Sequence, residues 1–170
     1  MSVTLSSLLT RAVALLDAAT YFSDIAVVEL TDGTIESRVQ QVLFARGLQT
    51  SDGSKTVKLG MACIVSITSA DITGDRRVRL TPVLRVAVIE NPTFNHGDGG
   101  TQKSVLDVCT EVFKAICAKS AAAGIAADDS ISTINGTSLE IISADVKRSL
   151  YGIEGGNAYH CNFTVGGIPL

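Results

Sequence analysis

Hydrophobic side chains recur at helical spacing in the first part of the chain. Between residues 4 and 19 they are Leu5, Leu8, Leu9, Ala12, Leu16 and Ala19. They would line one face of an α-helix, with Ser2 or Thr4 available as its cap. A short β-branched segment at 24–30 follows, and 34–46 repeats the helical spacing with Ile35, Val39, Val42 and Leu43. Gly47 is a natural end for this second predicted helix.

From Val57 the hydrophobic period changes to two, which predicts a strand. One face of this strand would carry Leu59, Met61, Cys63, Val65 and Ile67, and the alternation returns in Val78, Leu80, Leu84, Val86 and Val88. Residues 68–77 would join the two strands as an extended hairpin loop. Because Pro82 donates no ladder hydrogen bond, we expect an edge or a bulge near it.

The second half predicts one long helix and two further strands. Residues 101–123 carry an apolar stripe formed by Val105, Val108, Cys109, Val112 and Ile116. A small, polar connection at 121–138 precedes strands at 139–148 and 158–165. The predicted order is helix, helix, strand, strand, helix, strand, strand. We therefore expect one α+β domain over 1–170, with an antiparallel four-stranded sheet and helices packed on one face.

Composition indicates a surface used for protein contacts. Hydrophobic residues make up 46% of the chain and charged residues 18%, below the usual 25% or so. No apolar run reaches the ~18 residues that a membrane span needs, so we assign the excess to contacts between subunits. A formal charge of −3 gives no general attraction to nucleic acid.

The cysteines and the first residues indicate the reducing cytoplasm. Cys63, Cys109, Cys117 and Cys161 form no CxxC pair and fall on apolar phases of predicted elements, which is typical of buried free thiols. The chain's start lacks the positive region of a secretory signal.

Candidate chemical sites are weak. The string from Gly97 to Ser104 resembles a P-loop with Gln102 in place of a required glycine, and it does not follow a parallel strand directly. We interpret it as a glycine loop leading to a helix, with Asp98 or Thr101 as the cap. His96 and His160 are predicted to be solvated or interface histidines, because neither has a nucleophile beside it. We expect no catalytic, metal or cofactor site, and no enzyme activity.

An arginine cluster offers a further candidate. Arg76, Arg77 and Arg79, joined by Arg85 and by Lys147 and Arg148, could face DNA, but no aromatic residue interleaves with them to stack on bases. A solvated strand face or a set of interfacial ion pairs fits this cluster better.

The layout resembles the tail terminator and neck proteins of tailed bacteriophages. The resemblance rests on the leading helix, the stretch Tyr21-Phe22-Ser23-Asp24-Ile25, the string Val86-Ala87-Val88-Ile89-Glu90-Asn91-Pro92, and then Asn95 and Gly99-Gly100-Thr101. It implies a ring, commonly of six copies, at the head-proximal end of the tail. Such a ring caps the tail tube, meets the head connector and contacts DNA only as it passes through. The chain would lie in the host cytoplasm during assembly and in the virion afterwards.

Two loop regions are the predicted subunit interface. The first comprises Asp71, Ile72, Gly74, Asp75, Arg76 and Arg77, and the second Asn91, Pro92, Asn95, Gly99 and Gly100. The alternatives are a tail tube or other connector subunit, and a small α+β enzyme or ligand-binding domain. An enzyme would gather polar groups in a pocket near these loops, whereas an assembly subunit would bury them against neighbours.

Overall fold

The elements were assigned in a computed structural model. It describes residues 3–31, 48–49, 56–57, 60–74, 77–98, 100–117, 133–134, 137–150, 155–166 and 168–169. The predicted second helix at 34–46 lies outside these residues. Along the chain the elements are α1 (Leu5–Ala18), η1 (Thr20–Phe22), β1 (Ala26–Glu29), β2 (Leu48–Gln49), β3 (Thr56–Val57), β4 (Met61–Thr73), β5 (Arg79–Glu90), α3 (Pro92–Asn95), α4 (Val105–Cys117), β6 (Thr133–Ile134), β7 (Thr137–Ser138), β8 (Glu140–Arg148), β9 (Ala158–Gly166) and β10 (Ile168–Pro169).

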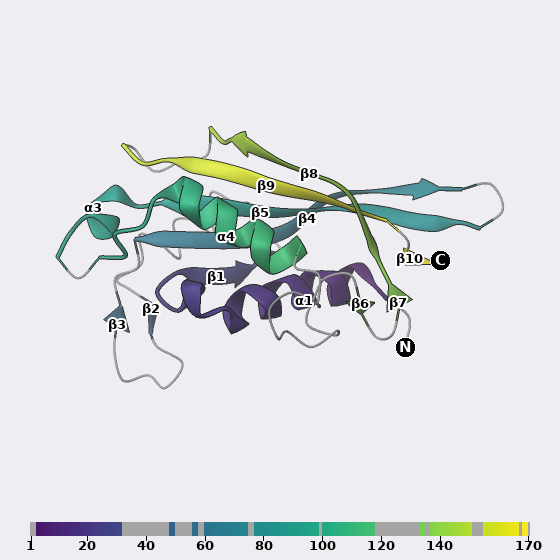
Figure 1. Ribbon diagram of the computed structural model, residues 1–170, viewed down its shortest axis with the longest axis horizontal. Helices are drawn as coiled ribbons and strands as arrows, with labels where there is room; N and C mark the ends of the chain where they lie inside the picture. The colour runs from purple at the N-terminus through teal and green to yellow at the C-terminus, as the bar shows by residue number, and fades with distance from the viewer. Residues whose placement is uncertain are drawn as a thin grey trace.

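The mixed α+β class is confirmed, but the predicted four-stranded antiparallel sheet is wrong. The main sheet has six strands in the order β1-β4-β5-β9-β8, with β10 also paired to β5 (Figure 1). β1 runs parallel to β4, with Ala26 beside Ala62, while the other pairs are antiparallel. The predicted element order is therefore also incomplete. Four residues in β1 and two in β10 are too few for a hydrophobic period to show how they pair.

The main core lies between the sheet and the two long helices. Thr4 caps α1 by accepting a hydrogen bond from the Ser7 backbone nitrogen, as the sequence predicts. α1 contacts β1 and β4, and α4 contacts β5 and β9, so both helices cover the same face. The buried side chains there include Leu8 and Leu16 of α1, Met61 of β4, Ile116 of α4 and Phe163 of β9.

The opposite face of the sheet has a smaller buried cluster. Ala62 and Ile64 of β4 lie beside Ala87 and Ile89 of β5, with Ala26 and Ala158 at the flanks. This explains why β4 and β5 are apolar on both faces near their paired ends. The strands become polar farther along, where β4 and β5 leave the helices.

β4 and β5 form a longer ribbon than the sequence predicts. The predicted loop at 68–77 is mostly strand, because β4 continues to Thr73 and pairs there with Arg79. The alternation ends at Ile67, but strands exposed on both faces need no apolar alternation. The register shifts by one residue at Thr68, opposite the stretch that contains Pro82, so the expected bulge is confirmed.

The glycine string is followed by a helix that begins later than predicted. α4 starts at Val105, not Thr101, so neither Asp98 nor Thr101 is its cap. Residues 101–104 before it are neither helix nor strand, and Gln102 has a φ of 54°, in the left-handed region. All four cysteines are free. Cys63, Cys109 and Cys161 are buried, whereas Cys117 is only partly buried. Among the described residues, no helix is long and apolar enough to cross a membrane.

Candidate functional site

The predicted interface residues lie at the two ends of the β4–β5 ribbon. Met61 of β4 pairs with Glu90, and Thr73 pairs with Arg79, so Asn91 follows one end of the ribbon and Gly74 begins the turn at the other. The two groups therefore do not form one site. Asp75, Arg76 and Gly99 lie outside the described residues. We call residues 69–81 the hairpin arm, and Glu90, Asn95, His96, Lys103 and Asn157 the Glu90 cluster.

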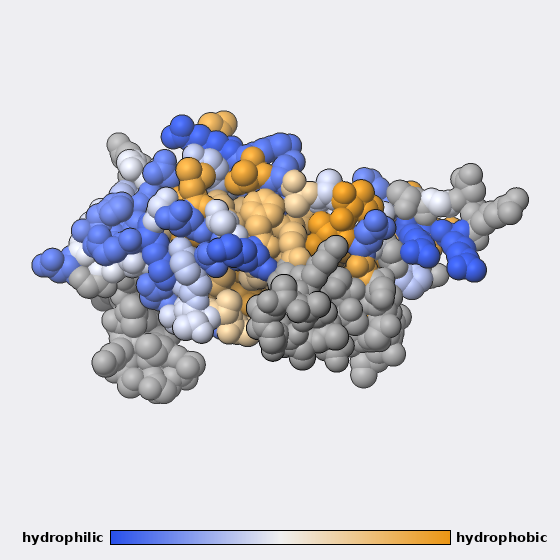
Figure 2. Space-filling view, viewed as in Figure 1, coloured by the Kyte–Doolittle hydropathy of each residue, from blue (hydrophilic) through white to orange (hydrophobic). Residues whose placement is uncertain are grey.

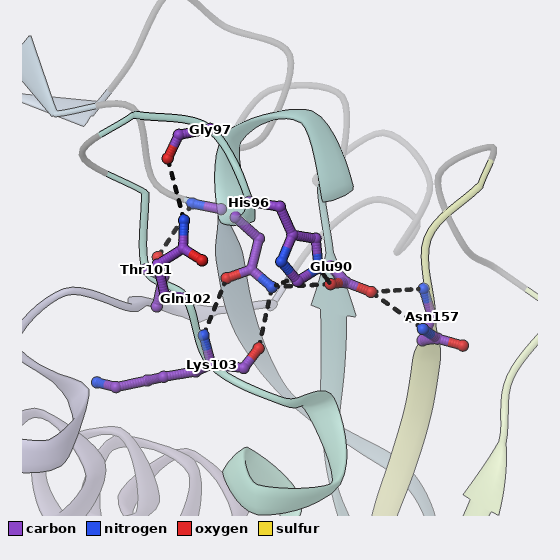
Figure 3. Close-up of polar contacts among 9 residues, drawn as sticks. Glu90, His96, Gly97, Thr101, Gln102, Lys103 and Asn157 are labelled. Carbon is purple, nitrogen blue, oxygen red and sulfur yellow. Dashed lines mark hydrogen bonds and ion pairs between the residues drawn. The ribbon is translucent and has the colours of Figure 1, made fainter.

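The Glu90 carboxylate is the centre of the cluster (Figure 3). Its Oε1 accepts a hydrogen bond from Asn95 Nδ2 at 2.7 Å and lies 2.9 Å from His96 Nε2. Its Oε2 accepts from the backbone nitrogen and from Nδ2 of Asn157, both at 3.1 Å. Burial opposes ionisation of this carboxyl, but the hydrogen bonds from Asn95, Asn157 and His96 outweigh it and lower its pKa.

Asn95 joins this carboxylate to the backbone of Lys103, just before α4. Asn95 Nδ2 also donates to the Lys103 carbonyl at 2.9 Å, and Asn95 Oδ1 accepts from the Lys103 backbone nitrogen at 3.2 Å. The Asn95 carbonyl accepts from the Gln102 nitrogen. Asn95 is fully buried, so its side-chain bonds stabilise the loop from inside the chain.

Two glycines allow the backbone to pass close to this loop. A Cβ on Gly60 would lie 2.2 Å from the Asn95 Cα, and one on Gly100 would lie 2.0 Å from the Phe94 carbonyl oxygen. Neither position has room for a side chain. The Gly60 nitrogen donates to Thr101 Oγ1, which ties the start of β4 to the same loop.

Lys103 connects the loop to η1 and to the residues that follow η1. Its ammonium group donates to the Tyr21 carbonyl at 2.7 Å, pairs with the Asp24 carboxylate, and lies 4.2 Å from the centre of the Tyr21 ring. The lysine of the P-loop-like string therefore has partners within the chain. The stretch 21–25 and the string 86–92, which carry the resemblance, meet through this residue and the Glu90 cluster.

The two histidines lie in different surroundings. The His96 side chain is largely exposed, with its Nε2 against the Glu90 carboxylate. His160 is on the polar phase of β9, as predicted, but it is buried, so the solvated alternative predicted for it is wrong. The interface alternative stays a prediction. Burial, and then the positive charge of Arg85, lower the pKa of His160.

Most described residues of the hairpin arm are exposed, although Leu80 is partly buried against the main core. Asp71, Ile72 and Gly74 are exposed on β4 and its turn, and Arg77 and Val78 are exposed before β5. The Ile72 side chain is 67% exposed. Gly74 has a φ of +99°, and a Cβ there would lie 2.4 Å from the Arg77 carbonyl oxygen, so the turn requires glycine. Figure 1 shows the arm extending beyond the helices and the other strands.

A polar row crosses the sheet on the face away from the helices. Ser66, Arg85, Asn162 and Asp145 lie side by side on β4, β5, β9 and β8. Arg85 Nε donates to Asn162 Oδ1 at 2.8 Å, and Asn162 Nδ2 donates to Asp145 Oδ1 at 2.7 Å. The bond from Asn162 is the main reason that the pKa of Asp145 is lowered. Arg85 thus has an internal partner, and its predicted cluster with the arm arginines divides between two regions.

Sequence reasoning named Asn91, Pro92, Asn95 and Gly100 for the interface but missed Glu90, Lys103 and Asn157. Asn91 and Asn95 are buried within the chain; a contact with a neighbouring subunit stays a prediction for this loop. Spacing could not reveal Asn157, which lies 67 positions from its partner Glu90. A buried acid at the end of an apolar strand was the available signal for Glu90 itself.

The described residues contain no group of three or more histidine, cysteine, aspartate or glutamate side chains placed to hold a metal ion. In comparisons with known proteins, no family model and no curated protein matches the chain.

Proposed function

We propose that the chain is a structural subunit of a tailed bacteriophage. Copies of it would form a ring at the head-proximal end of the tail, cap the tail tube and join it to the head connector. This is the function that the sequence resemblance implies. The hairpin arm and the Glu90 cluster support it.

The hairpin arm carries the proposal. Its residues extend past the helices that cover the rest of β4 and β5, and its Ile72 is exposed without a core around it. A two-stranded ribbon is marginal alone in water, and an apolar side chain at such a position gains stability when another protein buries it. A ring subunit, which meets an identical neighbour on each side, supplies that protein.

The opposite end of the β4–β5 ribbon carries the hydrogen-bonded Glu90 cluster in place of an exposed arm. The hydrogen bonds of this cluster link Glu90, Asn95 and the Lys103 backbone, with Pro92 at the start of α3 and Gly100 packed against the backbone. A joint between tube and connector needs two unlike ends on each subunit. The Glu90 cluster at one end and the hairpin arm at the other are suited to those two roles.

Two observations would test the proposal together. Negative-stain electron microscopy of the purified chain should show rings of uniform diameter. In the phage that encodes the chain, an early stop codon in its gene should give tails that grow past their normal length and heads that stay unattached. Normal virions from that mutant would overturn the proposal.

A further inference from the structure

Among the described residues, the main sheet has two open edges, on opposite borders. β8 pairs with β9 on one side, and within the described part of the chain no strand pairs with its other side. β4 is covered by β1 only from Ala62 to Val65, followed by one bond from the Leu30 nitrogen to the Val65 carbonyl. Beyond that point no described strand lies on the outer side of β4. Open edges offer unpaired backbone groups to another strand.

Exposed apolar side chains lie on both edges. Val146 of β8 is 45% exposed, and Ile72 of β4 is 67% exposed. Figure 2 shows hydrophobic surface near the end of β8, surrounded by hydrophilic surface. Isolated apolar residues on a protein surface are ordinary, but on one side of these two no described strand pairs with their own.

The two side chains point to the same face of the sheet. Val146 of β8 pairs with Cys161 of β9, and Cys161 belongs to the core under the helices. Ile72 is paired with Leu80, which packs against the same core. The preceding residue of β4, Asp71, and the following residue of β8, Lys147, therefore share the other face, because side chains alternate along a strand. Their charges are opposite, and Lys147 also pairs with Asp145 of its own strand, at 3.2 Å from the Asp145 Oδ2.

We propose that β4 of one copy pairs with β8 of the next copy through these edges. In the paired sheet, Ile72 lies opposite Val146 and Asp71 lies opposite Lys147. This inference rests on the proposed ring and adds the contact that builds it. Both pairs follow from one antiparallel register, and cross-strand apolar and opposite-charge pairs each stabilise a sheet.

The strand directions suit this pairing. β4, β5, β9 and β8 alternate in direction, so β8 runs opposite to β4. Copies related by rotation about a ring axis keep the same orientation, and β8 of one copy therefore meets β4 of the next as an antiparallel partner. Because one copy offers β4 and the other β8, the contact is head to tail, which generates a closed ring when the rotation closes.

The register also provides the stagger that a closed sheet needs. Across the sheet, Val146 is level with Val86 of β5, whereas Ile72 is level with Leu80 of β5. If Val146 of one copy lies opposite Ile72 of the next, the next copy is displaced along the strand direction by six residues. At about 3.3 Å per residue, the displacement along the strands is roughly 20 Å, and the width of four strands side by side is roughly 19 Å. The ratio gives a strand tilt of about 45°, close to the 35–45° of closed barrels.

Cysteine cross-linking tests the register. Ile72→Cys and Val146→Cys variants would be purified separately, mixed and oxidised. The mixture should give about tenfold more cross-linked dimer than either variant alone, because facing Cβ atoms in an antiparallel pair lie near disulfide reach. Mixing Ile72→Cys with Ile142→Cys is the matched control, since Ile142 is also exposed on β8 but four residues away. The unaltered chain controls for its own cysteines, and circular dichroism checks that each variant folds.

The outcomes separate the two proposals. Rings in the microscope without the Ile72–Val146 cross-link would overturn this pairing and leave the proposed function standing. Cross-linking of Ile72→Cys with itself would also overturn it, because that product requires two arms to meet. If the protein at millimolar concentration forms no rings and no cross-links, both proposals are contradicted.

Discussion

Gly60 lies directly against Asn95, so that a Cβ on Gly60 would come within 2.2 Å of the Asn95 Cα. The clash is with backbone, which cannot rotate away as a side chain can. Gly60→Ala should therefore reduce the free energy of unfolding by about 3 kcal/mol, at the upper end of the range for overpacking. Urea denaturation measures this directly.

Gly155→Ala is the matched control for that substitution. Gly155 has a φ of +78°, but a Cβ there meets nothing closer than Pro92 Cγ at 4.0 Å. It should lose only the ~1–2 kcal/mol of left-handed backbone strain. Equal losses in the two variants would show that the contact between Gly60 and Asn95 is not close.

The Glu90 carboxylate should make stability depend on pH in acid. Its pKa is lower in the folded chain than in the unfolded chain, where it is about 4.3, so the unfolded state binds more protons. The stabilisation is complete above the unfolded pKa and is lost as the pH falls through the folded value. Glu90→Gln should lower stability at neutral pH by about 2 kcal/mol, because its amide places donors against donors.

The pH series provides the control for this prediction. Urea midpoints between neutral pH and pH 3 should fall less steeply for Glu90→Gln than for the unaltered chain. Asp145→Asn removes a carboxyl that also has a lowered pKa but is half exposed, and it should change neutral stability little. An identical acid slope in Glu90→Gln and the unaltered chain would contradict the role given to Glu90.

Lys103 should stabilise the fold more than an exposed lysine does. Its ammonium group reaches Tyr21 in η1 and Asp24 just after η1, and its side chain is 23% exposed. Lys103→Met should cost about 1–2 kcal/mol. Lys114→Met removes an exposed ion pair with Glu111 and should cost under ~0.5 kcal/mol. Thermal melts of the two variants would agree only if the Lys103 contacts do not stabilise the fold.

The turn of the hairpin arm should matter for assembly and not for folding. Replacing residues 74–78 with Asn-Gly would join Thr73 to Arg79 through a two-residue turn that favours antiparallel strands. Leu80 and its pairing with β10 are kept, so the melting temperature of the monomer should stay within a few degrees. Ring formation should weaken, because the exposed Arg77 and Val78 are lost with the turn even though Ile72 and Asp71 are kept. Leu106→Ser, which removes an exposed apolar residue on α4, is the control and should leave rings intact.

The sequence predicted elements where one face is buried and the other is exposed. α1, with buried Leu8 and Leu16, and β9, with buried Cys161 and Phe163, were found near their predicted bounds because their apolar period is regular. β4 was predicted to end at Ile67 because its outer part has no buried face. The parallel pairing of β1 depends on β4, which is more than thirty positions away.

The site was only partly predictable, because contacts between distant parts of the chain leave no pattern in the sequence. Asn95 and Gly100 stood out as loop residues, yet their partners Glu90, Gly60 and Lys103 come from separate elements that the fold brings together. The exposed Val146 gave no signal, because an exposed valine and a buried one look alike in a strand pattern. Only burial in the folded chain distinguishes them.

Native mass spectrometry of the unaltered chain over a range of concentrations tests the central claim most directly. The ring account predicts a single closed oligomer, commonly of six copies, that grows at the expense of the monomer without larger species. A chain found only as a monomer, both alone and in purified phage particles, would contradict it.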